Sequence, residues 1–349
     1  MLELTIFFGS FLVTYFGVRW FRAWTLRRGV LDHPNERSSH TAPTPRGGGL
    51  VVAVVILMAY VLGSWLLDFE ISVGFLAGSL VVVAVSWLDD VYSISFVWRL
   101  LVQSAAAACV MLDLGHLSTV ATTGSAAPLD LGMFGVPITF LWIIWLVNAY
   151  NFMDGIDGIA GIQAVAAASG WLLAGLASGS SAVFILSGTV LLAALAFLLH
   201  NWSPARIFMG DAGSAFLGFT FASMPLMFRS STATDNGTAA FIGILVVWMF
   251  IFDSVFTIIR RLINGEKVWQ AHRQHLYQRL VISGYSHQRT TLIYGVFSLA
   301  IAISAGLSAG ENPRIPTYIA LVLAAAASIA LLGICHARKG LFGGGNSNG

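Results

Sequence analysis

The sequence of 349 residues is 57% hydrophobic and only 10% charged, whereas an ordinary globular protein has roughly 25% charged residues. The apolar content is too high for a soluble surface or for a disordered chain. A nucleic-acid-binding module is also excluded, because 18 basic and 16 acidic side chains leave a formal net charge of only +2. The composition therefore predicts a membrane protein with no nucleic-acid partner. Cys109 and Cys335 both lie in apolar stretches, which favours two buried thiols over a disulfide or a metal site.

Eleven segments are candidates to cross a bilayer, which takes a helix of roughly 20 apolar residues. In chain order they are 4–22, 50–67, 71–88, 97–114, 136–152, 159–178, 182–200, 212–228, 239–259, 291–308 and 316–336. Two are marginal, because 97–114 carries Arg99 near one end and 136–152 runs into Asn148 and Asn151. We expect an all-α integral membrane protein, a polytopic bundle of about 11 transmembrane helices.

The basic residues divide unevenly between the two sides of such a bundle. If the N-terminus is periplasmic, only Arg229 and Arg314 of the 18 Lys and Arg residues lie outside, and the other sixteen lie inside. Because Lys and Arg accumulate on the cytoplasmic side, this pattern predicts a periplasmic N-terminus and a cytoplasmic C-terminus. The first segment has no positive n-region and no cleavage site, so we expect it to remain as an anchor. Residues 1–336 are predicted to form one transmembrane domain, and 337–349 a disordered cytoplasmic tail.

The loops between the segments differ in length and character. Two inner loops, 23–49 and 260–290, are long and basic, and loops of that length in a compact bundle are usually functional. The outer stretch 115–135 is also long, but its Ser, Thr, Gly and Ala residues offer no chemistry. It is interpreted as a covering loop or hairpin.

Carboxylates are costly in a membrane protein, so their positions carry information about function. The outer acids each stand alone in or beside a loop, where a solvated charge is the simplest explanation. The inner acids instead gather at helix ends: Asp89 and Asp90 end the third segment, Asp154 and Asp157 follow the fifth, and Asp211 begins the eighth. This grouping indicates one polar site on the cytoplasmic side.

Adjacent carboxylates at a helix end repel one another, so Asp89 and Asp90 suggest a nearby cation or proton, with a pair facing water as the alternative. Asn148, Asn151, Asp154 and Asp157 recur every three residues, a spacing that drifts about 60° per step around a helix. Glycines after the two aspartates favour a helix that ends near Asp154, with the remaining polar groups in the loop. Amide and carboxylate oxygens are ligands suited to Mg²⁺.

Two further segments favour anionic ligands. Asp211 precedes an apolar helix whose free N–H groups would attract phosphate, although a simple N-cap by Asp211 is an alternative and both roles can coexist. The last inner loop holds His272, Arg273, His275 and Arg279, and arginine recognises phosphates with paired hydrogen bonds. Oxygen ligands, a helix N-terminus and these cations together predict a substrate with phosphate or pyrophosphate at the cytoplasmic interface.

The ordered motifs resemble those of the polyprenyl-phosphate N-acetylhexosamine-1-phosphate transferases, integral membrane enzymes that start O-antigen and other cell-envelope polysaccharides. The resemblance covers nearly the whole chain. It rests on Pro34-Asn35-Glu36-Arg37-Ser38-Ser39-His40, Pro43-Thr44-Pro45-Arg46-Gly47-Gly48-Gly49, Asp89-Asp90, Asn148 to Gly158, Gly210-Asp211-Ala212-Gly213-Ser214 and the His275 loop. It implies transfer of a sugar 1-phosphate from a UDP-sugar to undecaprenyl phosphate in the bacterial inner membrane, with release of UMP and with Mg²⁺, for which Mn²⁺ can substitute.

Carried over by position, the resemblance implies specific roles. Asn151 and Asp211 match the family's metal ligands, and Asp89 and Asp90 match its catalytic aspartates. Binding of the phosphates or the nucleotide falls to the remaining candidates, which are Arg99, Asn148, Asp154, Asp157, His272, Arg273, His275 and Arg279. The oligomeric state is left open between a monomer and a homodimer.

The histidine loop departs from one branch of the family. Relatives that use UDP-GlcNAc commonly carry His-x-His-His, where this chain has His275-Leu276-Tyr277-Gln278. The loop resembles that of O-antigen enzymes that accept 6-deoxy sugars such as UDP-N-acetylfucosamine or UDP-N-acetylquinovosamine, so the donor is expected to be one of these or UDP-GlcNAc. Two alternatives are a phospho-MurNAc-pentapeptide transferase and, in another class, a secondary transporter. The transporter is disfavoured because coupling sites lie near the membrane midplane, where Asp253 is the one deep candidate.

Overall fold

The computed structural model describes residues 1–32, 34, 43–120, 128–231, 237–267 and 273–342. It is a bundle of long helices with two short hairpins. The helices are α1 (Leu2–Arg28), α2 (Gly48–Leu67), α3 (Val73–Tyr92), α4 (Phe96–Leu114), α5 (Gly135–Met153), α6 (Ile159–Ser178), α7 (Ser181–Asn201), α8 (Asp211–Ser231), α9 (Thr238–Leu245), α10 (Trp248–Ile263), α11 (Leu276–Ile282), α12 (His287–Leu307) and α13 (Arg314–Phe342). The hairpins are β1 (Leu31–Asp32) with β2 (Thr44–Pro45) and β3 (Thr119–Val120) with β4 (Leu129–Asp130), and a short 3₁₀ turn, Gly132–Phe134, leads into α5.

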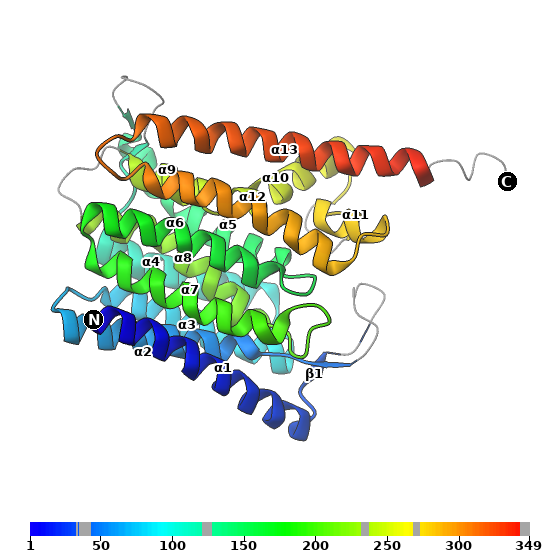
Figure 1. The fold of residues 1–349 in the computed structure, drawn as a ribbon, viewed down its shortest axis with the longest axis horizontal. Coiled ribbons are helices and arrows are strands. Elements are labelled where there is room, and N and C mark those ends of the chain that lie inside the picture. Colours follow the sequence, from blue (N-terminus) through cyan, green and yellow to red (C-terminus); the bar gives the residue numbers. More distant parts are fainter. Residues whose placement is uncertain (33, 35–42, 121–127, 232–236, 268–272, 343–349) are drawn as a thin grey trace.

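The expected class of fold is confirmed. Within the described residues nine helices are long and apolar enough to span a membrane, and they include both marginal segments, as α4 and α5. α1 begins at one end of the bundle and α13 runs toward the other, as an odd number of crossings requires (Figure 1). Which end faces the cytoplasm stays a prediction. The outer stretch is confirmed as a hairpin, with Thr119 opposite Asp130.

The segment 239–259 is not one straight helix. It divides into α9 and α10, whose axes differ by 73° across a short break. The Gln163 side-chain amide on α6 donates to the Val246 carbonyl at 2.8 Å, so a backbone group freed by the break is still hydrogen-bonded. The sequence could not indicate this bend, because hydrophobicity measures how apolar a segment is and contains no information about its direction.

The helix α8 is the eighth predicted segment. It is helical but lacks the hydropathy of a lipid-exposed span, and Pro225 lies inside it. Every residue from 212 to 228 is buried, and α8 packs against α2, α3 and α5. Its small and polar residues are therefore surrounded by protein and not by lipid, a setting in which they allow close helix packing.

The C-terminal boundary differs from the prediction. α13 continues to Phe342, so residues 337–342 are helical where a disordered tail was expected. The last segment, 343–349, lies outside the described residues. The expected boundary followed the end of the apolar stretch, but a helix that has begun in the membrane can continue into water for several residues.

The helices α2 and α8 touch backbone to backbone near their N-terminal ends. A Cβ on Gly213 would lie 2.5 Å from the Gly49 Cα, and a Cβ on Gly49 would lie 2.3 Å from the Gly213 Cα. The N–H groups of Gly48 and Gly49 donate to the carbonyls of Phe208 and Met209, which places the start of α2 beside the segment that leads into α8. Any side chain at this crossing would separate the two helices.

We expect Gly213→Ala to lower the thermal midpoint of the purified protein in detergent, because overpacking costs about 1–3 kcal/mol. Gly9→Ala on α1 is the matched control, since a Cβ there meets nothing within 4 Å. The control should melt at or above the wild-type midpoint. Equal midpoints for the two variants would contradict the close crossing of α2 and α8.

Candidate active site

The ends of α3 and α5 and the start of α8 meet at one end of the bundle, which we call the aspartate end. Asp90 is the buried centre of this junction. Its carboxylate accepts hydrogen bonds from the Asp211 and Ala212 backbone N–H groups at 3.0 and 3.1 Å, and from the Arg46 guanidinium. The N-terminus of α8 is therefore capped by Asp90. The alternative of an N-cap by Asp211 itself does not hold, because Asp90 reaches those N–H groups from another helix.

The neighbouring carboxylate, Asp89, has separate partners. It accepts from the Arg99 guanidinium at 2.7 Å and from the Ile94 backbone N–H at 2.6 Å. Each aspartate of the pair is thus neutralised by its own arginine, Asp90 by Arg46 and Asp89 by Arg99. The repulsion that suggested a cation or proton is relieved by these two guanidinium groups.

Asp211 lies next to this pair, and its ion pair with Arg99 is longer than that of Asp89. Its carboxylate is 3.6 Å from the Arg99 guanidinium and close enough to Asn151 and Asp89 to interact with both side chains. Asn151 donates an amide N–H to the Ser214 hydroxyl at 2.9 Å, a bond that does not use its carbonyl oxygen. Asn151 and Asp211 therefore meet across α5 and α8, as the prediction that both bind one metal ion requires.

A glycine makes this arrangement possible. Gly210 has a positive φ of 77°, and a Cβ there would lie 2.7 Å from the Asp90 carboxylate and 3.0 Å from the Gly47 backbone. A side chain at position 210 would thus displace Asp90 from the α8 N-terminus. The backbone of residues 45–47 and of residues 208–210 can approach one another only because of this glycine.

Asp154 follows the last residue of α5, so the predicted helix end is confirmed. Burial, and then the charges of Asp211, Asp90 and Asp157, raise the pKa of Asp154 to about 8. Asp157 has the opposite character. Burial pushes the pKa of Asp157 up, but hydrogen bonds from His287, Ser203 and the Ala205 N–H outweigh it and hold that pKa below its usual range. The aspartate end thus combines an ionised Asp157 with a carboxyl group that resists ionisation.

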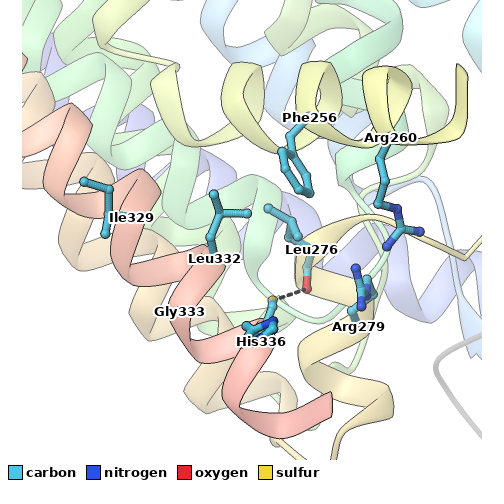
Figure 2. A pocket seen from close by; sticks show the side chains of 9 residues that line it. Phe256, Arg260, Leu276, Arg279, Ile329, Leu332, Gly333 and His336 are labelled. Carbon is cyan, nitrogen blue, oxygen red and sulfur yellow. Dashed lines mark hydrogen bonds between the residues drawn. The ribbon is translucent and has the colours of Figure 1, made fainter. Parts of the chain in front are cut away.

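The remaining predicted residues belong to α5, to α11 and to the histidine loop. Asn148 donates to the Gln103 side chain on α4 at 2.6 Å, which turns its amide N–H groups toward α4. Arg279 lines a groove between α10, α11 and α13 (Figure 2). Arg273 is half-buried in the histidine loop, and His272 lies outside the described residues.

The histidine loop is held by one buried carboxylate. Asp253 on α10 accepts from His275 Nδ1 at 3.2 Å, from the Leu276 and Tyr277 N–H groups at 2.8 and 3.0 Å, and from the Tyr294 hydroxyl at 2.6 Å. The Tyr277 hydroxyl in turn donates to the Phe152 carbonyl, two residues before Asp154. This chain of contacts connects the loop to the aspartate end. Asp253, the one deep carboxylate that a transporter could use for coupling, is therefore committed to the histidine loop, with His275 as its ionic partner.

Sequence reasoning missed several of these positions. Arg46 and Ser214 were noted only as parts of motifs, and His287 and Tyr294 were not singled out. No spacing rule connects them to their partners, because each contact joins segments far apart in the chain. Arg46 had a local signal, as an arginine in the Pro-Arg-Gly-Gly-Gly run of a long loop, and so had Ser214, at the end of the Gly-Asp-Ala-Gly-Ser run.

The predicted Mg²⁺ can be tested against the residues present. In the part of the chain that the structure describes, no three His, Cys, Asp or Glu side chains form a metal-binding group. Mg²⁺ does not need one, since it is usually bound by one or two carboxylates together with substrate phosphates and water. The Asp211 carboxylate and the Asn151 amide oxygen, beside carboxyl groups that raise the pKa of Asp154, fit a site of that kind.

The fold and the site define a polytopic helical membrane protein with paired aspartates and arginines at one end of its bundle. A family model described as Glycosyl transferase family 4 matches residues 72–229, which run from the N-cap of α3 into the end of α8. Similar proteins extend this match over most of the chain. The chain belongs to this family, and the resemblance inferred from the motifs is confirmed.

Three relatives illustrate the extent of the match. The chain is 30% identical to a probable undecaprenyl-phosphate N-acetylglucosaminyl 1-phosphate transferase of Bacillus subtilis (strain 168), over 85% of this chain and 82% of that protein. It is 30% identical to a decaprenyl-phosphate N-acetylglucosaminephosphotransferase of Mycobacterium tuberculosis (strain ATCC 25618 / H37Rv), over 92% and 86%. It is 27% identical to an undecaprenyl-phosphate alpha-N-acetylglucosaminyl 1-phosphate transferase of Salmonella typhi, over 90% and 85%.

Tyr294→Phe should destabilise the protein, because a hydrogen bond to a charged group contributes about 1.5–3 kcal/mol. The hydrogen bond that is lost reaches the buried Asp253 carboxylate, which connects α10, α11 and α12. Thermal midpoints in detergent measure it, with Tyr318→Phe as the control, since Tyr318 is an exposed tyrosine of α13. If Tyr294→Phe melts with the control, Asp253 does not organise the loop.

Stability should depend on pH through Asp154. Its pKa of about 8 in the folded protein lies above the ordinary 3.8, so the folded state holds a proton that the unfolded state has lost between those values. The free energy of unfolding therefore falls as pH rises toward 8 when no divalent cation is present. Asp154→Asn should flatten this fall between about pH 5.5 and about pH 8.5, measured as thermal midpoints in EDTA.

The exposed carboxylate Glu311 provides the control for that experiment. Glu311→Gln should follow the wild-type curve, since it changes only an exposed side chain. A curve for Asp154→Asn that runs parallel to the wild type would show that Asp154 is not a buried, titrating group.

Proposed function

We propose that this protein transfers an N-acetylhexosamine 1-phosphate from a UDP-sugar to a polyprenyl phosphate, undecaprenyl phosphate in a bacterial inner membrane, and releases UMP. The observation that carries the proposal is the junction of Asp89, Asp90, Asp211, Arg46 and Arg99 at one end of a membrane bundle. Family membership and the names of the relatives support the reaction class. The biased distribution of basic residues supports a cytoplasmic position for the aspartate end.

In this reaction an oxygen of the lipid phosphate forms a bond to the sugar-bearing phosphorus of the donor. The bond from that phosphorus to the bridging oxygen breaks, and UMP leaves with the electron pair. A lipid phosphate has a second pKa near 6, so at neutral pH it is already largely dianionic and needs little help from a base. The main tasks of the protein are to hold two anionic substrates in line and to offset their charge.

The two aspartates have different parts in this scheme. Asp90 accepts from two backbone N–H groups and from Arg46, so it holds the junction together and is poorly placed to act as a nucleophile. Asp89 orients Arg99, which is partly exposed and also lies near Asp211. Arg99 is thus the cation best placed to bind an incoming phosphate. This arrangement favours direct attack by the lipid phosphate over a route through an aspartyl-phosphate.

Mg²⁺, or Mn²⁺ in its place, would be held by Asn151 and Asp211 and would neutralise charge on the diphosphate when bound. Ser214 orients the Asn151 amide toward that role through its hydrogen bond. His275, fixed by Asp253, would bring a further donor to the substrate side of the histidine loop.

The proposed reaction should depend on Asp211 and on a divalent cation. UMP release by purified protein with undecaprenyl phosphate and a UDP-sugar should stop in EDTA and return with Mg²⁺ or Mn²⁺. Asp211→Asn should lower the rate at least about a hundredfold while the thermal midpoint changes little, because Asp90 and not Asp211 caps α8. Asp130→Asn, on an exposed strand, is the control. Full activity of Asp211→Asn, or of the wild type in EDTA, would remove the metal assignment.

A further prediction concerns the sugar of the donor. The same assay with a panel of UDP-sugars should give a rate with a UDP-linked N-acetylated 6-deoxyhexosamine at least equal to that with UDP-GlcNAc. Tyr277 is fully buried and Gln278 hydrogen-bonds the His275 N–H, so these residues would act on sugar choice by positioning the loop. A strong preference for UDP-GlcNAc would contradict this prediction and would assign to this chain the N-acetylglucosamine named for its relatives.

A further inference from the structure

A groove of about 570 Å³ lies between α10, α11 and α13, apart from the aspartates (Figure 2). Its walls are mostly apolar, with Phe256 from α10, Leu276 from α11 and Leu332 from α13. Gly333 leaves one wall without a side chain, and a Cβ there would meet nothing within 4 Å. The groove therefore offers an apolar channel on the outer surface of the bundle.

Three basic side chains line the same groove. Figure 2 shows Arg260 and Arg279 facing one another, with His336 beside Arg279. Burial, and then the charge of Arg260, lower the pKa of the Arg279 guanidinium. Arg260 donates to the Gln274 side chain, but its buried Nε has no hydrogen-bond partner among the described residues. Within the described residues neither arginine forms a salt bridge, although the Asp253 carboxylate is near enough to Arg279 to favour its charge, so the groove gathers positive charge.

The charge and the apolar walls are ordered along the helices. Phe256 lies one turn before Arg260 on α10, and Leu332 lies one turn before His336 on α13. The cations thus lie nearer the ends of these helices, and the apolar walls extend toward the membrane interior. A ligand that matches this order has an anionic head and a hydrocarbon chain. Guanidinium groups recognise phosphate with paired, charge-assisted hydrogen bonds.

We propose that this groove binds an anionic glycerophospholipid, with its phosphate against Arg260 and Arg279 and one acyl chain along Phe256 and Leu332. The groove is distinct from the transfer site, since the opposite contacts of α11, through Tyr277, are made with the turn after α5. The Leu276 N–H binds Asp253, so a lipid that packs on Leu276 stabilises the segment that positions His275. Basic clusters near membrane ends of helices are a general means of anionic lipid recognition.

The test is lipid retention by the purified full-length protein in detergent, measured by native mass spectrometry with phosphatidylglycerol and phosphatidylcholine as probes. The wild type should retain phosphatidylglycerol and not phosphatidylcholine. Arg260→Gln with Arg279→Gln should weaken phosphatidylglycerol binding about tenfold or more. The charge-matched control is Arg27→Gln with Arg28→Gln, two exposed arginines at the end of α1, which should bind as the wild type does.

A second variant tests the apolar part independently of charge. Gly333→Leu places a side chain in the groove and should reduce binding by a similar factor, whereas Gly9→Leu, also in open space on α1, should not. Equal retention by all variants, or equal retention of the two lipids, would overturn the proposal. Displacement of phosphatidylglycerol by undecaprenyl phosphate at equal concentration would also overturn it and would assign the groove to the acceptor.

Discussion

The hydrogen bonds of the Asp90 carboxylate are the interaction on which the aspartate end depends. One side chain from α3 caps α8 and pairs with Arg46 from the segment before α2, so three parts of the chain converge on two oxygens. A buried carboxylate is stable only when its hydrogen bonds are satisfied. Here the donors are the Arg46 guanidinium and the two N–H groups at the start of α8, and Asp90 satisfies these donors in return. The site is therefore also a structural junction, which explains why Gly210 must leave room for it.

Below this junction, α8 passes through the protein interior with neighbours on every side. A helix in that position does not need an apolar surface against lipid, and its glycines, serines and threonines allow the backbone to approach α2 and α5 closely. Close approach is what brings Asn151 of α5 beside Asp211 of α8. The weak hydropathy of this segment and the geometry of the candidate metal site have the same physical origin.

A second buried carboxylate, Asp253, organises the other half of the site. It connects α10, the histidine loop and α12, and Tyr277 carries the connection to the turn that holds Asp154. The loop is thus positioned by a network remote from the aspartates. The groove that we assign to an anionic lipid touches the same short helix, α11, from another direction. The membrane and the transfer site would therefore act on one shared element.

The sequence alone determined the class of fold, the segments that become helices and the helix ends where acids gather, because hydrophobicity and the cost of charge in a bilayer are local properties of a segment. It also placed Asp89, Asp90, Asn151 and Asp211 together through their order in known motifs. Only the tertiary structure decided which partner each acid takes: Arg46 for Asp90, Arg99 for Asp89 and His275 for Asp253. It also decided the bend between α9 and α10 and the position of Arg279 in a separate groove. These features depend on contacts between residues distant in the chain, which no local pattern of apolar and charged residues encodes.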